Sequence, residues 1–519
     1  MTNAGGSTRT RFALGFLTLL GILGVAAGLR LYGIGVNLPN YPAPDEPQIV
    51  ERAFSVGGGD LNPHFFAWPG NLLIYANTAV FTTYYVTGRM TGRFASTGDF
   101  RREFKEDATN FYVLARLLNI AAALVTIALV FRAVAPLGLI ASASAGLLIA
   151  VSPLHVGESA VAYTDVPATL LLTASMLAIR SFRDKPTGIA FFMAGLLIGL
   201  AAAVKYYAVI GAVGITCAAM LSPAVLGQRL RLLALGAAGA MLGFVIGCPF
   251  SVLAFNEFKG ELLTEMAHQR EGHIGFDQST NPLLGYFTNS LIPAIGVPAL
   301  AASVVGIWLA GRHHREFLPL LVTAFGYLVL TTSTNVSFPR YAIPHVVLLS
   351  VLVGIAASRL GRVPVVAPVA AVVILAGPAV RAVGVMSQRA MKDTRVVAAE
   401  WLEAHVPSTA RILASEDGPR YPATFRISRF RPVTDKQFAA VRAGTIDVFV
   451  LTWSTTELMQ DESVARTYPE IASSHRALYQ WVKTHAALEG RFLPDDVHQG
   501  PSIEVYMTTS ASKGASQIP

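Results

Sequence analysis

Two adjacent carboxylates stand out as groups that could do acid–base chemistry. Asp45 and Glu46 occur in the segment Tyr41-Pro42-Ala43-Pro44-Asp45-Glu46-Pro47. Proline favours the first turn of a helix, so the pair is expected at a helix N-terminus. The helix dipole there favours an ionised carboxylate, which is the form that can accept a proton. The alternative interpretation is a helix N-cap without a further role.

A third carboxylate, Asp165, lies in Thr164-Asp165-Val166-Pro167, soon after the segment Ser152-Pro153-Leu154-His155. We predict that it lies at the mouth of a membrane-spanning helix. A carboxylate in a membrane is costly, about 3 kcal/mol at the centre of a helix and less near an end. That cost favours a functional role, although a helix cap remains the alternative.

Two cations are expected near these acids. Lys205 precedes Tyr206-Tyr207, and Arg340 precedes Tyr341. Snorkelling of the side chains to the membrane interface would explain most such residues. The topology described below, however, places both on the side of the membrane where the positive-inside rule disfavours cations. Two cations beside two acidic motifs therefore suggest a bound anion.

The rest of the composition indicates which elements position these residues. The sequence has 53% hydrophobic and 14% charged residues, whereas a soluble domain has about 25% charged residues. Apolar segments of about 20 residues can cross a bilayer as helices. We predict an all-α polytopic membrane domain over residues 1–386, with about eleven transmembrane helices. They are placed near 12–33, 111–133, 137–153, 165–182, 188–204, 206–226, 232–252, 285–310, 316–333, 340–358 and 363–386.

Charge decides the predicted topology. If residues 69–88 form an interfacial helix rather than a span, the short basic loops between the later spans all face the cytoplasm together with the N-terminus. The net charge of +8 is then explained by these loops, and no nucleic-acid partner is expected. Residues 34–110, 154–164, 253–284 and 334–339 and the tail from about 387 are predicted to face outside.

The tail is predicted to be a small α/β extracytoplasmic domain over residues 387–519. Asp393 or Thr394 can cap a helix that continues to His405. Three strand-like apolar segments follow. They are Arg411–Ser415, Asp447–Thr452 and Ser502–Thr508.

The segment 253–284 contains further polar residues, among them His268, Glu271, His273 and Asp277. Histidines are common metal ligands, so His268 and His273 are candidates for a metal site. Their spacing fits no familiar metal signature, and a solvated loop is the alternative. No cofactor is assigned, and a divalent metal is left open.

The order of the motifs resembles the bacterial branch of the GT-C membrane glycosyltransferases. It is similar to the superfamily of protein O-mannosyltransferases and lipid A aminoarabinose transferases, over roughly residues 12–360. The motifs that carry the resemblance are Asp45-Glu46, Leu61-Asn62-Pro63-His64-Phe65-Phe66-Ala67-Trp68-Pro69, Arg116-Leu117-Leu118-Asn119, Ser152-Pro153-Leu154-His155, Thr164-Asp165 and Arg340-Tyr341.

The resemblance implies a polyprenyl-phosphate sugar donor and catalysis on the outer face of the membrane. It implies that Asp45 is the catalytic base, that Glu46 is the other member of the pair, and that Asp165 assists acceptor or metal binding. Substrate binding is assigned to Lys205, Arg340, Tyr341, His64 and His155. Aminoarabinose transferases have Glu-Lys where Ala67-Trp68 stand here, which argues against transfer of that sugar to lipid A.

We therefore predict a hexosyl- or mannosyl-type glycosyltransferase of the bacterial inner membrane. It would transfer a sugar from a polyprenyl-phosphate donor to an extracytoplasmic hydroxyl on a protein, glycan or lipid, in a single displacement with inversion. Two alternatives belong to other classes: a transporter or flippase of a lipid-linked anion, and a non-catalytic membrane scaffold. A transporter would favour midplane sites or inverted repeats, and the sequence shows neither.

Overall fold

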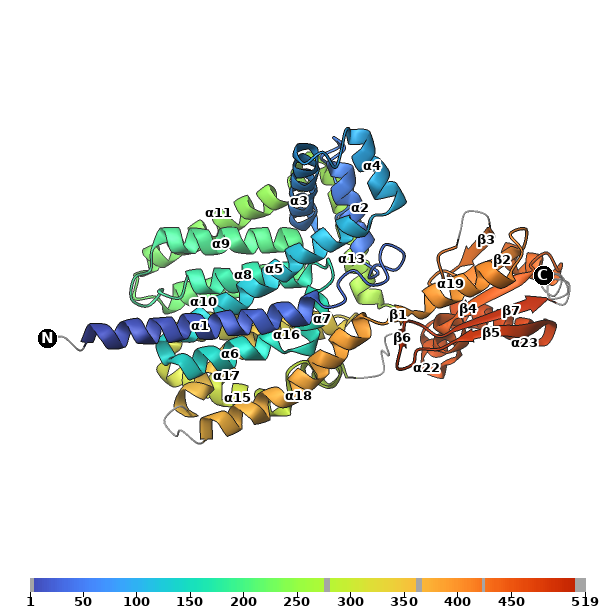
Figure 1. Ribbon diagram of the computed structural model, residues 1–519. Coiled ribbons are helices and arrows are strands. Elements are labelled where there is room, and N and C mark those ends of the chain that lie inside the picture. Colours follow the sequence, from blue (N-terminus) through green and yellow to red (C-terminus); the bar gives the residue numbers. More distant parts are fainter. Residues whose placement is uncertain (1–3, 275–280, 361–365, 422–424, 509–519) are drawn as a thin grey trace. The chain divides into compact units, whose positions relative to one another are not determined.

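The computed structural model describes residues 4–274, 281–360, 366–421 and 425–508 (Figure 1). The chain divides into two compact units. The first comprises Met1–Gly35, Pro42–Glu271 and Pro282–Met386, and the second comprises Val36–Tyr41, Gly272–Asn281 and Ser387–Pro519. The assignment of residues 1–386 to a membrane domain and of 387–519 to an extracytoplasmic domain stays a prediction.

The first unit is a bundle of helices. Long apolar segments fold as helices because each backbone polar group then finds its partner within the segment. The bundle comprises α1 (Ala4–Leu31), α2 (Glu46–Val56), α3 (Asn71–Met90), α4 (Thr97–Glu106), α5 (Thr109–Val134), α6 (Leu139–Ala150), α7 (Pro153–Ser159), α8 (Asp165–Ala178), α9 (Gly188–Val204), α10 (Gly211–Leu221), α11 (Leu226–Gly247), α12 (Phe250–Leu253), α13 (Phe255–Glu271), α14 (Pro282–Tyr286), α15 (Ile292–His313), α16 (Leu318–Thr332), α17 (Ile343–Leu360) and α18 (Val366–Arg389).

Helices occur at all eleven positions predicted to be spans, but their lengths differ. Within the described residues, six helices are long and apolar enough to cross a membrane: Phe12–Leu31, Thr109–Leu137, Leu226–Gly247, Pro282–His313, Pro339–Arg359 and Val366–Arg389. A seventh results if α6 and α7, which are bent by 59° relative to each other, form one span. The other positions carry shorter helices. The chain is thus multi-pass by length and composition, and the count of eleven stays a prediction.

Helix α3 occupies the segment for which an interfacial position is predicted. It is 20 residues long, yet it is not among the candidate spans in the described part of the chain. Figure 1 shows α3 running across the direction of α9 rather than along it. An interfacial position remains the prediction for this helix.

The tightest helix pair is α9 with α11. A Cβ atom at Gly195 or Gly199 of α9 would lie 1.9 Å or 2.0 Å from a carbonyl oxygen of α11. Reciprocally, a Cβ atom at Gly239 or Gly243 of α11 would lie 2.2 Å from a carbonyl oxygen of α9. Glycines four residues apart on both helices let the two backbones touch, as in small-residue contacts between membrane helices.

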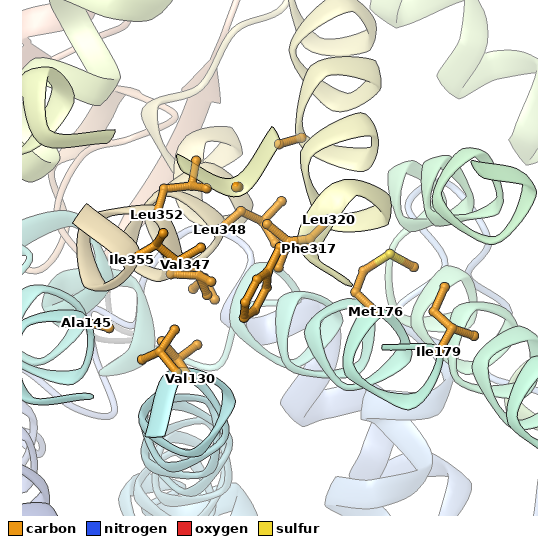
Figure 2. Packing of buried hydrophobic residues seen from close by; sticks show 14 of the residues in the cluster. Val130, Ala145, Met176, Ile179, Phe317, Leu320, Val347, Leu348, Leu352 and Ile355 are labelled. Atoms are coloured by element: carbon orange, nitrogen blue, oxygen red, sulfur yellow. The ribbon is translucent and has the colours of Figure 1, made fainter. Parts of the chain in front are cut away.

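The centre of the bundle is a continuous hydrophobic core (Figure 2). Side chains from many of the helices meet there, so that each of these helices buries one face. The labelled members are Val130 of α5, Ala145 of α6, Met176 and Ile179 at the end of α8, Phe317 and Leu320 at the start of α16, and Val347, Leu348, Leu352 and Ile355 of α17. This core holds together α8 and α17, near whose N-termini Asp165 and Arg340 lie.

The second unit contains a five-stranded mixed sheet in the order β3-β2-β4-β7-β5. The strands β2 (Arg411–Ser415), β3 (Arg426–Phe430) and β4 (Val448–Thr452) are parallel neighbours, whereas β7 (Ile503–Thr508) is antiparallel to β4 and to β5 (Ala486–Phe492). Helix α19 (Thr394–His405), capped by the Asp393 side chain, packs on one face, and α23 (Pro469–His485) packs on the other. The predicted capped helix and three strands are confirmed. Strands β3 and β5 were not predicted.

Candidate active site

Four charged side chains converge on one cavity of the helical unit. Asp45 is the residue before α2, Asp165 begins α8, Lys205 follows the last residue of α9, and Arg340 lies in the short helical segment Pro339–Ala342 before α17. Consecutive helices that run in opposite directions bring the start of α8 and the end of α9 to the same end of the bundle. The cavity has a volume of about 560 Å³, and all four side chains line it, together with Tyr341.

Asp165 and Lys205 form a buried ion pair. Lys205 Nζ donates a hydrogen bond of 2.7 Å to Asp165 Oδ1. The ammonium group also lies 4.7 Å from the ring centre of Tyr341 and 5.5 Å from that of Tyr207. Lys205 is thus held between an acid and two aromatic faces and is shielded from water.

Arg340 lies between the two aspartates. Its Nη2 is 2.9 Å from Asp45 Oδ2, and its Nε is 3.8 Å from Asp165 Oδ2, which is too far for a hydrogen bond. Among the described residues, no hydrogen-bond acceptor is found for this buried Nε–H group. The guanidinium also packs on the rings of Phe338 and Tyr163, at 4.3 Å and 5.0 Å from their centres. Arg340 thus has a fixed orientation and a donor to spare.

Glu46 does not share the cavity with Asp45, although the two are adjacent in sequence. Arg116 donates from Nε and Nη2 to its two carboxylate oxygens, at 2.8 Å and 2.6 Å. The backbone N–H groups of Ala43 and Ala162 donate to the same carboxylate, each at 2.8 Å. Glu46 therefore joins the turn that carries Asp45 to the turn that precedes Asp165. A catalytic role was predicted for Glu46, whereas its contacts in the structure are those of a residue that holds two turns together.

The two histidines predicted to bind substrate are not among the described residues that line the cavity. His155 is fully buried, and its Nδ1 lies 3.0 Å from Arg30 Nη2. Arg30 also donates to the carbonyl oxygens of Ala26 and Ala150, the last residue of α6. This cluster joins α1 to the bend between α6 and α7 and is part of the scaffold.

His64 lies in a separate polar contact at the surface. Its Nδ1 is 2.8 Å from Glu257 Oε1, and its Nε2 is 3.1 Å from Asp60 Oδ2. The hydrogen bond with Glu257, followed by that with Asp60, raises the pKa of the His64 imidazole above its usual value. His64 thereby helps attach the segment before α3 to α13.

Sequence reasoning missed one wall of the cavity. The segment 253–284 was interpreted as a loop, but its residues Phe255–Glu271 form helix α13. One side of this helix lines the cavity through Leu262, Glu265, Met266, Gln269 and Arg270. Of these, Leu262 and Met266 are apolar and four residues apart, which is a weak helical signal and does not indicate that Glu265 or Gln269 lines a cavity.

The donor set does not fit a metal centre. In the part of the chain that the structure describes, no three His, Cys, Asp or Glu side chains are grouped so that they could hold a metal ion. Asp45 and Asp165 are engaged by Arg340 and Lys205. The proposed ligands His268 and His273 therefore gain no third ligand there, and Asp277 lies outside the described residues.

The comparison with protein families yields one match. Residues 82–258 match the family described as dolichyl-phosphate-mannose-protein mannosyltransferase. This range covers α4 to α12, including Asp165 and Lys205 but neither Asp45 nor Arg340. No curated protein matches the sequence at a significant level.

The fold is similar to that of solved membrane glycosyltransferases. ArnT from Cupriavidus metallidurans, bound to undecaprenyl phosphate, is 13% identical with a TM-score of 0.53, over 95% of this chain and 97% of that chain. The archaeal oligosaccharyltransferase AglB from Archaeoglobus fulgidus, in complex with an inhibitory peptide and a dolichol-phosphate, is 11% identical with a TM-score of 0.53, over 98% of this chain and 75% of that chain. The predicted resemblance to GT-C membrane glycosyltransferases is confirmed.

Proposed function

We propose that this protein transfers a sugar from a polyprenyl-phosphate donor to the hydroxyl group of an acceptor. The observation that carries the proposal is the convergence of Asp45, Asp165, Lys205 and Arg340 on one cavity of about 560 Å³. The family match and the fold shared with ArnT, which was solved with undecaprenyl phosphate, support it.

In the proposed reaction, Asp45 accepts the proton of the acceptor hydroxyl as its oxygen attacks the anomeric carbon. The bond from that carbon to the phosphate oxygen breaks, and the polyprenyl phosphate leaves with the bonding electron pair. The product is a glycoside of inverted configuration. Asp165 orients Lys205 through the 2.7 Å ion pair and does not itself need to exchange a proton.

Lys205 and Arg340 are proposed to hold the phosphate because its charge grows during the reaction. A phosphodiester carries about −1 charge, whereas the released phosphate monoester carries about −1.5 to −2 at neutral pH. Cations fixed beside the phosphate therefore stabilise the transition state more than the bound donor. The spare Nε–H group of Arg340 is placed to donate to such an anion.

The topology is part of the proposal. We infer eleven spans, an interfacial α3, a cytoplasmic N-terminus, and a site and tail on the outer face of a bacterial inner membrane. The support is the distribution of basic short loops. A reporter fused after Met386 that is active only outside the cytoplasm would agree with this orientation, and cytoplasmic activity would reverse the face on which the site acts.

The activity is tested by incubating the purified protein in nanodiscs with radiolabelled polyprenyl-phosphate sugars, beginning with a mannosyl or another hexosyl donor. The wild type should release free polyprenyl phosphate and label an extracted acceptor, whereas Asp45→Asn should not. In proteoliposomes, movement of intact donor across the bilayer without release of polyprenyl phosphate would instead favour a flippase. Mass analysis of lipids, glycans and glycoproteins from a deletion strain would identify whether the acceptor is protein, glycan or lipid.

A further inference from the structure

The wall of the cavity made by α13 differs in chemistry from the end that holds the ion pairs. The side of α13 that lines the cavity presents Glu265 and Gln269, with Leu262 and Met266 beside them and the exposed Arg270 at its end. Trp68 lines the same cavity. The cavity thus has a charged end with two ion pairs, made by four different helix ends, and a second wall from α13 that combines hydrogen-bonding and apolar groups with one solvent-exposed cation.

Glu265 and Gln269 form a pair one helical turn apart. Gln269 Nε2 donates a hydrogen bond of 2.8 Å to Glu265 Oε1. This contact fixes both side chains on the same side of the helix. The amide oxygen of Gln269 and the second carboxylate oxygen of Glu265 can then accept hydrogen bonds from a ligand. Two neighbouring acceptors match two neighbouring hydroxyl groups.

Helix α13 is anchored at both ends, so the pair is held in place. Toward its N-terminus, Glu257 accepts a hydrogen bond of 3.0 Å from Asn62, and Glu261 accepts one from the backbone N–H of Phe66. Toward its C-terminus, Asn335 donates from its backbone N–H to the carbonyl oxygen of Gln269, at 3.1 Å. A wall fixed in this way loses little conformational freedom when a ligand binds.

From these contacts we propose that Glu265 and Gln269 bind the hydroxyl groups of the donor sugar and thereby select a neutral sugar over a uronic acid. The inference rests on the proposed function, because it takes the phosphate to lie at the charged end. The apolar side chains of the same wall and the Trp68 ring would contact the C–H groups of the sugar.

The charges that line the cavity explain why a uronic acid is disfavoured as the donor sugar. At the charged end, Lys205 and Arg340 pair with Asp165 and Asp45 and are proposed to hold the donor phosphate, so they are not available to a sugar carboxylate. A sugar carboxylate placed beside Glu265 would bring two carboxylates together in a partly buried site, which is unfavourable. Arg270 lines the same wall but is exposed to solvent, where its attraction for a sugar carboxylate is screened. Hydroxyl groups, in contrast, donate to the Glu265 carboxylate. The cavity volume lies within the usual range for small-molecule sites, about 300–1,000 Å³.

The test separates recognition of the sugar from recognition of the lipid phosphate. Binding of polyprenyl phosphate, of a polyprenyl-phosphate hexose and of a polyprenyl-phosphate hexuronic acid is measured in nanodiscs for the wild type, Glu265→Gln and Gln269→Ala. Glu271→Gln is the matched control, because Glu271 ends the same helix and is not among the described cavity-lining residues.

We expect Glu265→Gln and Gln269→Ala to weaken binding of the hexose donor at least about tenfold. Binding of sugar-free polyprenyl phosphate should stay within about twofold of the wild type, which also shows that the variants are folded. Glu265→Gln should narrow the preference for the hexose over the uronic acid.

Two results would overturn the inference: unchanged hexose binding in both variants, or an equal loss for the donor and for sugar-free polyprenyl phosphate. The result for the proposed function is read separately. If the wild type binds the donors but transfers no sugar, the proposed activity fails, while the difference in binding still decides the role of Glu265 and Gln269.

Discussion

Arg340 Nη2 lies 2.9 Å from Asp45 Oδ2, so the proposed base and a proposed phosphate ligand are paired with each other. Asp45 lies near the first helices of the chain and Arg340 near the last helices of the bundle. Their contact therefore joins segments that are far apart in the sequence. A donor phosphate that binds the spare Nε–H group of Arg340 would share the guanidinium with Asp45, which is bound by Nη2. The proposed base and the donor phosphate would thus lie on the same side chain.

Arg340→Lys should not preserve function, although the substitution keeps the positive charge. The guanidinium contacts both aspartates with different nitrogen atoms and packs on two rings, whereas an ammonium group is a compact point charge. We expect weaker donor binding and a lower rate, because the phosphate is present in both the ground state and the transition state.

Donor binding and turnover in nanodiscs measure this effect, with Lys205→Ala as the companion variant. Wild-type values for both variants would mean that the two side chains only snorkel to the interface, and the proposed phosphate site would lose its support.

Asp45→Asn should abolish transfer without unfolding the protein. The substitution keeps the shape of the side chain but removes the group that accepts the proton, and loss of a general base typically costs about 10²–10⁴-fold in rate. Turnover is compared at equal amounts of folded protein. Asp184→Asn, in an exposed turn after α8, is the matched control and should keep full activity. A well-folded Asp45→Asn variant with near-normal turnover would remove Asp45 from the mechanism.

Glu46→Gln should act on stability first. The carboxylate is fully buried and paired with Arg116, and removing one partner of a buried ion pair costs about 3–5 kcal/mol because the other charge stays buried. The melting temperature in detergent should fall, whereas Glu51→Gln, exposed on the same helix, should leave it unchanged. If Glu46 is instead a catalytic partner of Asp45, turnover should vanish at an unchanged melting temperature.

The predictions from the sequence succeeded where a single segment decides the structure and were incomplete where contacts between distant segments decide it. The apolar length of the segment around Ile127 is enough to predict a helix. Nothing local to Glu46 reveals that Arg116 will bind both of its oxygens, because that pairing exists only after α2 and α5 meet. The two neighbours Asp45 and Glu46 look equivalent in the sequence, and the fold separates them.

The candidate site shows the same division. Asp165, Lys205 and Arg340 were predicted because charge at the end of an apolar helix is unusual. Glu265 was not predicted, because acids are ordinary in a polar segment and only the packing of α13 brings this one to the cavity. His155 shared a motif with other candidates, but its position is set by the buried Arg30 of α1.

Gly199→Ala should destabilise the bundle, although alanine is the better helix former. The added Cβ would lie 2.0 Å from the Ala240 carbonyl oxygen of α11, so the two helices must separate. We expect a loss of about 1–3 kcal/mol, as for overpacking in other cores. Gly227→Ala is the matched control, because a Cβ at that position of α11 meets nothing within 4 Å. Thermal unfolding in detergent compares the two, and equal melting temperatures would contradict the close contact.

The attachment of α13 should weaken as the pH rises. Hydrogen bonds to Glu257 and Asp60 raise the pKa of His64, so the protonated imidazole favours the folded contact. The stabilisation is complete below the unperturbed histidine pKa of about 6.5 and is lost as the pH rises through the raised pKa. Hydrogen exchange of the α13 amides, corrected for the intrinsic effect of pH, should therefore accelerate above that range.

His64→Gln should remove this pH dependence, whereas His405→Gln in the second unit should leave it as in the wild type. An α13 whose corrected exchange does not change with pH in the wild type would show that the contacts of His64 do not hold the helix.

The glycine contact between α9 and α11 also limits how the protein can evolve. The two helices touch through main-chain atoms, so a point mutation there can only add atoms, and the position of Lys205 just after α9 is set by the backbone. The α13 wall, in contrast, meets the cavity through side chains that can be exchanged one at a time. Single substitutions are therefore poorly tolerated at the Lys205 end of the cavity and better tolerated in the α13 wall. Sequence differences among relatives should accumulate in the α13 wall.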